Sequence, residues 1–140
     1  MIGDAIAAKA EEWIDVPFRW QGRVRAGCDC KGLVVGVFAE LGLREAESVY
    51  ALAGDYGTVV PVPRLRAGLS DLFDRVSDRQ PGDLLLIVAS GKAQHLAICA
   101  PRPNQPTRVI EAMCRGPERV RPYRRADREI DSIWRVRAAS

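Results

Sequence analysis

The chain has 140 residues, enough for one domain that spans residues 1–140 and buries a substantial core. Its 47% apolar and 28% charged residues are ordinary for a globular protein, and no apolar run reaches the roughly 18 residues of a membrane-spanning helix. The start Met1-Ile2-Gly3-Asp4 has no basic leader before an apolar stretch, so we expect synthesis in the cytoplasm without Sec export. We therefore expect the four cysteines to be reduced.

The net charge of +3 is uneven along the chain. Residues 101–140 hold ten arginines against five acids, whereas the first hundred residues carry a net charge of −2. A basic C-terminal third could approach a polyanion, but aromatic residues do not alternate regularly with the arginines as a base-stacking surface would require. We therefore favour a solvated, charged sheet edge and expect no nucleic-acid partner.

The first half of the chain shows helical periodicity. Apolar residues at helical spacing predict a helix over 3–14 that Pro17 ends, and the aperiodic segment 18–27 is expected to be a loop. The same period predicts a helix from about Cys30 to Leu41, terminated by Gly42, and another over 65–76. We expect the glycines at 32 and 36 to allow close packing of the middle helix on a sheet.

After Pro81-Gly82 the pattern changes to short β-prone runs separated by turn residues. The runs are 84–88, 96–100, 108–112, 119–123 and 130–136. Helices followed by strands indicate an α+β fold, with a mostly antiparallel sheet of about five strands.

Cys30 is the candidate nucleophile. Asp29 is a natural N-cap residue, which places Cys30 at the first helical position. Unpaired amides and the helix dipole favour negative charge there and lower a thiol pKa. A buried structural cysteine is the alternative, but Cys30 precedes the first apolar position of the helix, Leu33.

His95 is the only histidine in the chain and lies at the start of a predicted strand. A thiolate nucleophile needs a proton acceptor that later protonates the leaving amine. A helix-start cysteine followed downstream by a strand histidine has the papain-like order. If Ala100 pairs with Pro106 across the turn, residue 95 lies opposite Glu111, which would orient the imidazole.

A metal site is a competing interpretation. It would recruit Cys28, Cys30, Cys99 and His95, and Cys114 as a further ligand. Structural zinc sites usually show Cys-x-x-Cys pairs, whereas this chain has Cys-x-Cys and two scattered thiols. We therefore expect no metal and no cofactor.

Five segments carry recognisable motifs, namely residues 17–22 (PFRWQG), 27–34 (GCDCKGLV), 81–85 (PGDLL), 95–98 (HLAI) and 109–112 (VIEA). Together they resemble the NlpC-type cell-wall cysteine peptidases. The compact chain is most similar to peptidases encoded among phage-tail and gene-transfer-agent genes. The resemblance covers nearly the whole chain in the right order.

The resemblance implies a papain-like fold and cleavage of peptidoglycan stem peptides, typically between γ-D-glutamate and a diamino acid. It implies that Cys30, His95 and Glu111 are catalytic. It implies a tail protein with tail-tip or baseplate partners, acting at the periplasmic cell wall without membrane insertion. The substrate-contacting positions that it implies are Phe18, Trp20, Gln21, Asp29 and Lys31.

Three positions depart from the family pattern. Phe18 stands where tyrosine is usual, Lys31 where serine is common, and Glu111 where a histidine, asparagine or glutamine is usual. The absent tyrosine hydroxyl raises a second hypothesis, a weakly active or inactive tail-tip protein that keeps the peptidase fold. An amidase or acyltransferase with the same catalytic pair is a third.

Overall fold

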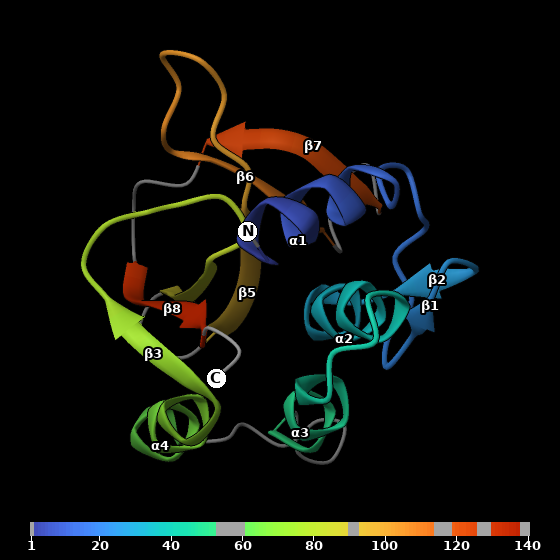
Figure 1. Cartoon of the computed structure of the whole chain (residues 1–140). Coiled ribbons are helices and arrows are strands. Elements are labelled where there is room, and N and C mark those ends of the chain that lie inside the picture. Colours follow the sequence, from blue (N-terminus) through green and yellow to red (C-terminus); the bar gives the residue numbers. More distant parts are fainter. Residues whose placement is uncertain (1, 53–60, 90–92, 114–118, 126–129, 138–140) are drawn as a thin grey trace.

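The computed structural model describes residues 2–52, 61–89, 93–113, 119–125 and 130–137. Its helices are α1 (Ile2–Glu11), α2 (Cys30–Glu40), α3 (Glu45–Leu52) and α4 (Val62–Leu72). Its strands are β1 (Arg23–Val24), β2 (Gly27–Cys28), β3 (Phe73–Val76), β4 (Leu84–Ala89), β5 (Ala93–Cys99), β6 (Arg108–Ala112), β7 (Val120–Arg125) and β8 (Ile130–Val136). The arrangement is α+β, as expected (Figure 1).

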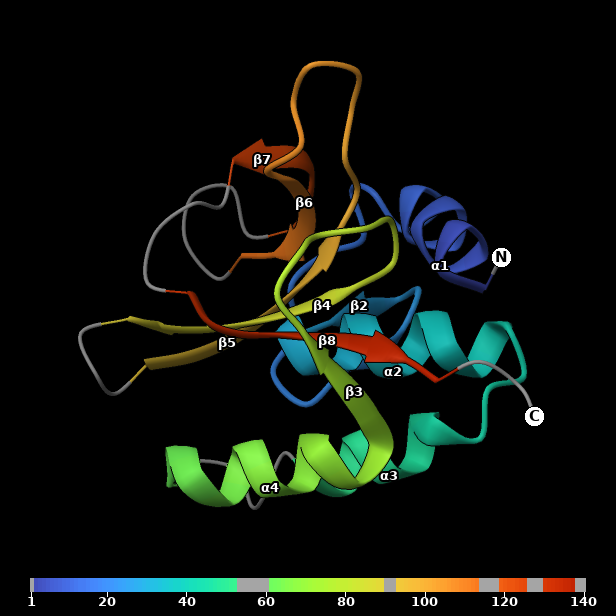
Figure 2. The ribbon, with the colours of Figure 1, turned by 60° about the vertical axis from the view of Figure 1, so that its left-hand side comes forward.

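The main sheet has the strand order β3-β8-β4-β5-β6-β7, and every neighbouring pair is antiparallel. It contains the five strands expected from the sequence and adds β3 as an edge strand. Figure 2 shows β4, β5 and β8 running side by side, with α3 and α4 beneath them. The described residues contain no helix long and apolar enough to cross a membrane.

Helix α2 is the central element of the larger hydrophobic core. Its residues from Gly32 to Phe38 are all buried, which explains why its sequence is apolar almost all round. It packs against α1, α3, β5 and β6. The Cys30 end of α2 is thereby fixed next to the strand that carries His95.

The two glycines inside α2 pack closely, but not against the sheet as expected. A Cβ on Gly32 would lie 1.7 Å from the carbonyl oxygen of Gly22, and one on Gly36 would lie 2.2 Å from the Trp13 ring. The partners are therefore the loop before α2 and Trp13, two residues beyond the end of α1.

Other elements differ from their predictions. Residues 73–76 are expected to end a helix, but α4 ends at Leu72 and residues 73–76 form the edge strand β3. The segment 18–27 was expected to be a loop, but it contains β1 and the start of β2. Helix α3 was not predicted, since only Ala46 and Val49 of its eight residues are buried. Helix α1 ends at Glu11, three residues before its predicted end.

The Pro81-Gly82-Asp83 turn fixes the start of β4. Gly82 has a φ of +85°, and a Cβ there would lie 2.2 Å from the carbonyl oxygen of Gly3, so only glycine fits without strain. The buried Asp83 carboxylate accepts hydrogen bonds from the Gln80 amide at 2.8 Å and from Arg135 at 2.9 and 2.8 Å. The Pro81-Gly82-Asp83 motif is therefore explained by its role in holding the start of β4.

Candidate active site

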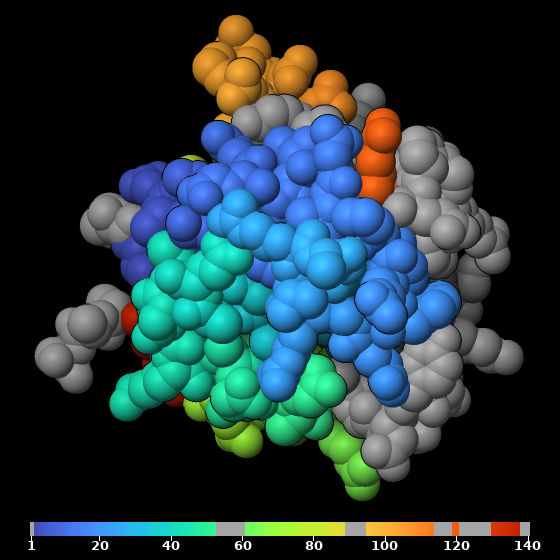
Figure 3. All heavy atoms as spheres, turned by 90° about the vertical axis from the view of Figure 1, so that its right-hand side faces the viewer, coloured from blue at the N-terminus to red at the C-terminus, as the bar shows by residue number. Residues whose placement is uncertain are grey.

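The segment from Pro17 to Asp29 is tied to the start of α2 by backbone contacts (Figure 3, light blue, beside the blue α1). The Cys28 amide donates to the Pro17 carbonyl at 3.0 Å, and the Asp29 amide donates to the Gly22 carbonyl at 3.1 Å. Because Gly22 also lies against Gly32, the segment is held directly on the first turn of α2.

Asp29 is the N-cap of α2, as predicted. Its backbone is extended, and its Oδ1 accepts from the Gly32 amide at 2.7 Å. Its Oδ2 accepts from the Gln21 amide at 2.9 Å. One carboxylate thus satisfies a helix-start donor and tethers the preceding loop, which places Cys30 at the first helical position.

Cys30 is half-buried and lies next to His95 and the backbone of Leu96. Burial and the charge of Asp29 raise the pKa of the Cys30 thiol. Hydrogen bonds from His95 and from the Leu96 amide, with the positive charge of the imidazolium, more than offset this. The pKa of Cys30 therefore lies below that of an ordinary thiol, which favours the nucleophilic thiolate.

His95 lies between Cys30 and Glu111. Its Nε2 is 3.7 Å from Oε1 of Glu111, an ion-pair separation that is too long for a hydrogen bond. Nε2 is buried and has no hydrogen-bond partner among the described residues. Burial lowers the pKa of His95, but its contacts with Cys30 and Glu111 outweigh this and raise it to about 10. Both shifts favour a thiolate–imidazolium pair beside a carboxylate.

The predicted register of β5 and β6 was wrong by two residues. Ile98 pairs with Ile110 and Cys99 with Val109, because the connection folds into an inner turn and Ala100 pairs with Arg108 instead of Pro106. A shift by an even number of residues leaves each side chain on the same face of the sheet. Glu111 therefore becomes a diagonal neighbour of His95 and remains within reach of its ring.

The other described cysteines differ from Cys30. Cys28 and Cys99 are fully buried, and burial is the main cause that raises the pKa of each thiol to about 12. All three are free thiols, and no three metal-ligating side chains cluster anywhere in the described part of the chain. Cys114 of the competing metal interpretation lies outside the described residues.

The predicted substrate-contacting residues belong to the loop and to the first turn of α2. Phe18 is half-buried, and its ring packs edge-on against Trp20 with a centroid distance of 4.9 Å. Trp20 is 59% exposed, Gln21 is exposed, and Lys31 is half-buried. The structure brings these residues to the α2 end of the site, and their contacts with substrate stay a prediction.

A profile of the NlpC/P60 family matches residues 15–116, which is most of the chain and includes Cys30, His95 and Glu111. The chain belongs to the NlpC/P60 family. The fold agrees with a solved structure, the NlpC/p60 domain of the peptidoglycan hydrolase SagA, at a TM-score of 0.59 and 25% identity. That alignment covers 96% of this chain and 98% of the SagA domain. Comparison of the sequence with curated proteins gave no match.

Membership in the NlpC/P60 family confirms the expectation of a cysteine peptidase with a papain-like α+β fold. It does not depend on any one side chain, because the matched region includes the loop, α2, β5 and β6. The predicted cysteine, histidine and third polar residue all lie within the matched region, and their catalytic roles stay a prediction.

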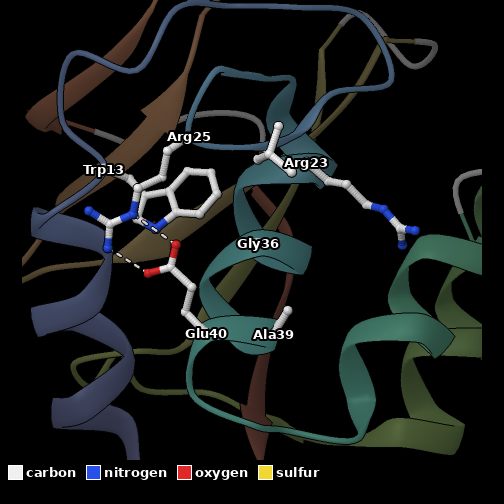
Figure 4. A pocket seen from close by; sticks show the side chains of 7 residues that line it. Trp13, Arg23, Arg25, Gly36, Ala39 and Glu40 are labelled. Carbon is white, nitrogen blue, oxygen red and sulfur yellow. Dashed lines mark hydrogen bonds and ion pairs between the residues drawn. The ribbon is translucent and has the colours of Figure 1, made fainter.

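A shallow pocket of about 270 Å³ lies elsewhere, over the middle of α2 (Figure 4). Its floor is Trp13, Gly36 and Ala39, and its rim includes Arg25, which donates to Glu40 at 2.8 Å. Neither Cys30 nor His95 lines it. We therefore identify the active site of this NlpC/P60 domain from its reactive groups and not from this hollow.

Two features of the site were missed in the sequence. The Leu96 amide, which contacts the Cys30 sulfur, is a backbone group and leaves no residue-type signal. The tether between Gln21 and Asp29 depends on a left-handed backbone at Gln21, with a φ of +62°. Asp29 suggested a cap, but nothing in the sequence indicated its second partner.

Proposed function

We propose that the chain is a cysteine endopeptidase that hydrolyses the stem peptides of peptidoglycan. Cys30 is the nucleophile, His95 the general base and acid, and Glu111 the group that orients the imidazole. The observation that carries the proposal is the contact between a thiol of lowered pKa and an imidazole of raised pKa at the start of α2.

The proposed reaction follows the acyl-enzyme route. The Cys30 thiolate attacks the scissile carbonyl carbon, and the carbonyl π-electron pair moves to oxygen. As the intermediate collapses, the C–N bond breaks and the leaving amine takes the proton of the His95 imidazolium. Water, deprotonated by His95, then hydrolyses the thioester and restores the thiolate–imidazolium pair.

Peptidoglycan as substrate is supported by the SagA domain, whose title names a peptidoglycan hydrolase, and by the shared family motifs. We propose the bond between γ-D-glutamate and the diamino acid as the scissile bond, and a role in a phage tail or gene-transfer agent at the periplasmic cell wall. Tail-tip or baseplate proteins are the corresponding partners. These finer points depend on the resemblance of the motifs.

Phe18 supports the second candidate, a weakly active or inactive structural tail-tip protein with the same fold. Its ring packs on Trp20 and has no hydroxyl with which to polarise a scissile carbonyl. Loss of one oxyanion donor costs about 10²–10³ in turnover, so such a protein would bind its particle without measurable hydrolysis.

Digestion of purified peptidoglycan, with mass spectrometry of the released muropeptides, separates the two candidates. We expect wild-type protein to release fragments ending in γ-D-glutamate, and Cys30→Ala to release none while keeping its circular dichroism spectrum. Cys99→Ala is the matched control, because Cys99 is a buried thiol in β5 that plays no part in the reaction. Absence of products from wild type between about pH 5 and 9 would support the structural candidate. Fragments cut at a different bond type would indicate an amidase or acyltransferase.

A further inference from the structure

A row of three residues crosses the sheet at the His95 imidazole. Ile87 of β4 lies directly opposite His95 of β5, and Ile130 of β8 lies directly opposite Ile87. Directly opposed residues share one face of a sheet, with Cβ atoms about 4.5–5.5 Å apart. The strand order β8-β4-β5-β6 therefore places the two isoleucines on one side of His95 and Glu111 on the other (Figure 2).

The two isoleucines expose apolar surface beside the imidazole. Ile87 and Ile130 are half-buried, and His95 is half-buried as well. Two residues further along the same strands, on the same face, Leu85 and Ala97 are fully buried. Accessible apolar surface on this face of β4 therefore begins at Ile87, next to the imidazole.

A shift in the pairing of β8 with β4 selects isoleucine for this row. The register changes by one residue here, so that Asp131 is the extra residue of a β-bulge and Ile130 takes the place opposite Ile87. In an unshifted register Asp131 would lie opposite Ile87, and its carboxylate would share the face of the imidazole. Instead the Asp131 carboxylate accepts a hydrogen bond from Nε of Arg66, in α4, at 2.8 Å. The bulge thus removes an anion from the row and supplies an apolar side chain.

The part of a substrate that leaves as an amine lies against this row. His95 gives its proton to the leaving amine, so the residue that carries the amine contacts the imidazole. Glu111 occupies the β6 side of the ring, which leaves the side of Ile87 and Ile130. We infer that Ile87 and Ile130 form the leaving-group subsite and bind the aliphatic side chain of the residue whose amine is released. This inference rests on the proposed function, because it requires acyl transfer at Cys30 with His95 as the acid.

A diamino acid matches such a subsite. Its side chain has several methylene groups before the polar end, so the methylene groups can cover the isoleucines while the polar end stays in water. One methylene group in an enclosed pocket changes discrimination between substrates by about 10–200-fold. Because this surface is half-open, we expect a whole aliphatic side chain to gain only about tenfold over glycine.

An incoming amine tests the subsite without peptidoglycan, because it enters where the leaving amine departs. p-Nitrophenyl acetate first acetylates Cys30. An added amine then attacks the thioester carbonyl carbon and gives a proton to His95, while the C–S bond breaks and the sulfur leaves as a thiolate. Norleucinamide and glycinamide differ only in the butyl side chain of the former. We expect wild-type protein to acetylate norleucinamide about ten times faster than glycinamide at equal concentrations.

Ile87→Ala is the decisive variant. It should reduce the ratio of norleucinamide to glycinamide acetylation below about 3 and leave the glycinamide rate near wild type. Ile130→Ala should reduce the ratio in the same direction. Ile133→Ala is the matched control, because Ile133 is a half-buried isoleucine on the same face that pairs with Leu85, outside the row of His95. Its ratio should equal that of wild type, and circular dichroism shows whether each variant is folded.

A wild-type ratio in folded Ile87→Ala or Ile130→Ala would overturn the inference. An equal fall in Ile133→Ala would also overturn it, as would wild-type protein without a preference for norleucinamide. Wild-type protein that shows the preference but releases no muropeptide would refute the proposed substrate and leave the subsite standing. Failure of wild-type Cys30 to become acetylated would refute both.

Discussion

Removal of the Asp29 carboxylate tests how the loop and α2 are joined. Oδ1 caps the helix through the Gly32 amide, and Oδ2 holds the Gln21 amide. Loss of an N-cap costs about 1 kcal/mol. A hydrogen bond to a charged group contributes about 1.5–3 kcal/mol when buried, which we reduce to about 1 because Asp29 is half-buried and water can replace it. Asp29→Ala should therefore lower the free energy of unfolding by about 2 kcal/mol.

Asp29→Asn separates the two contributions. Asparagine caps helices as well as aspartate does, but its side chain has only one acceptor oxygen. Asp29→Asn should therefore lose the hydrogen bond from the Gln21 amide and lower the free energy of unfolding by about 1 kcal/mol. Urea unfolding monitored by circular dichroism measures both variants, and the alanine variant should melt roughly 5–8 °C lower. Asp4→Ala is the control, since Asp4 lies in the first turn of α1 and should cost under about 0.5 kcal/mol. A change below about 0.5 kcal/mol for Asp29→Ala, or equal losses for both variants, would refute the double role.

Further predictions concern the pair and the packing of α2. Because the pKa of Cys30 is lowered and that of His95 is raised to about 10, the pair is charged between the two values. Cys30 alkylation by iodoacetamide should therefore stay fast below neutral pH, whereas a rate that follows an ordinary thiol pKa would contradict the ion pair. Glu111→Gln removes a negative neighbour, so the pKa of His95 should fall, and the alkaline limb of kcat/KM should move to lower pH; an unmoved limb would exclude this coupling. Gly36→Ala should cost about 1–3 kcal/mol, because its Cβ would meet a rigid tryptophan ring at 2.2 Å. Gly68→Ala, which meets only the flexible end of a leucine, should be neutral or stabilising by urea denaturation, and equal effects would count against the packing argument.

The sequence predicted α2 to within one residue because three signals agreed there. The apolar residues follow the helical period, Asp29 provides a cap, and Gly42 with a φ of +71° ends the helix. Cys30 and His95 followed from chemistry, since they combine a helix-start thiol with a single histidine. The structure places the two side chains in contact, and their catalytic roles stay a prediction.

The errors arose where local patterns were ambiguous. Phe73 and Val76 fit a helical stripe, yet they lie in an edge strand that pairs with β8. The packing partners of Gly32 and Gly36 were assigned to the wrong element, because a sequence does not show which neighbour approaches a helix. The β5–β6 register was misjudged because the hairpin connection contains an inner turn from Arg102 to Gln105.

The contrast between neighbouring thiols has a practical consequence. Cys28 is sealed in the interior two positions from Cys30, and Cys99 is equally enclosed. Among the described cysteines, a soft electrophile carrying a fluorophore should therefore tag one sulfur per correctly folded molecule. In a Cys114→Ala variant, the bound dye would then count competent copies directly, even inside a large assembly, without prior replacement of Cys28 or Cys99.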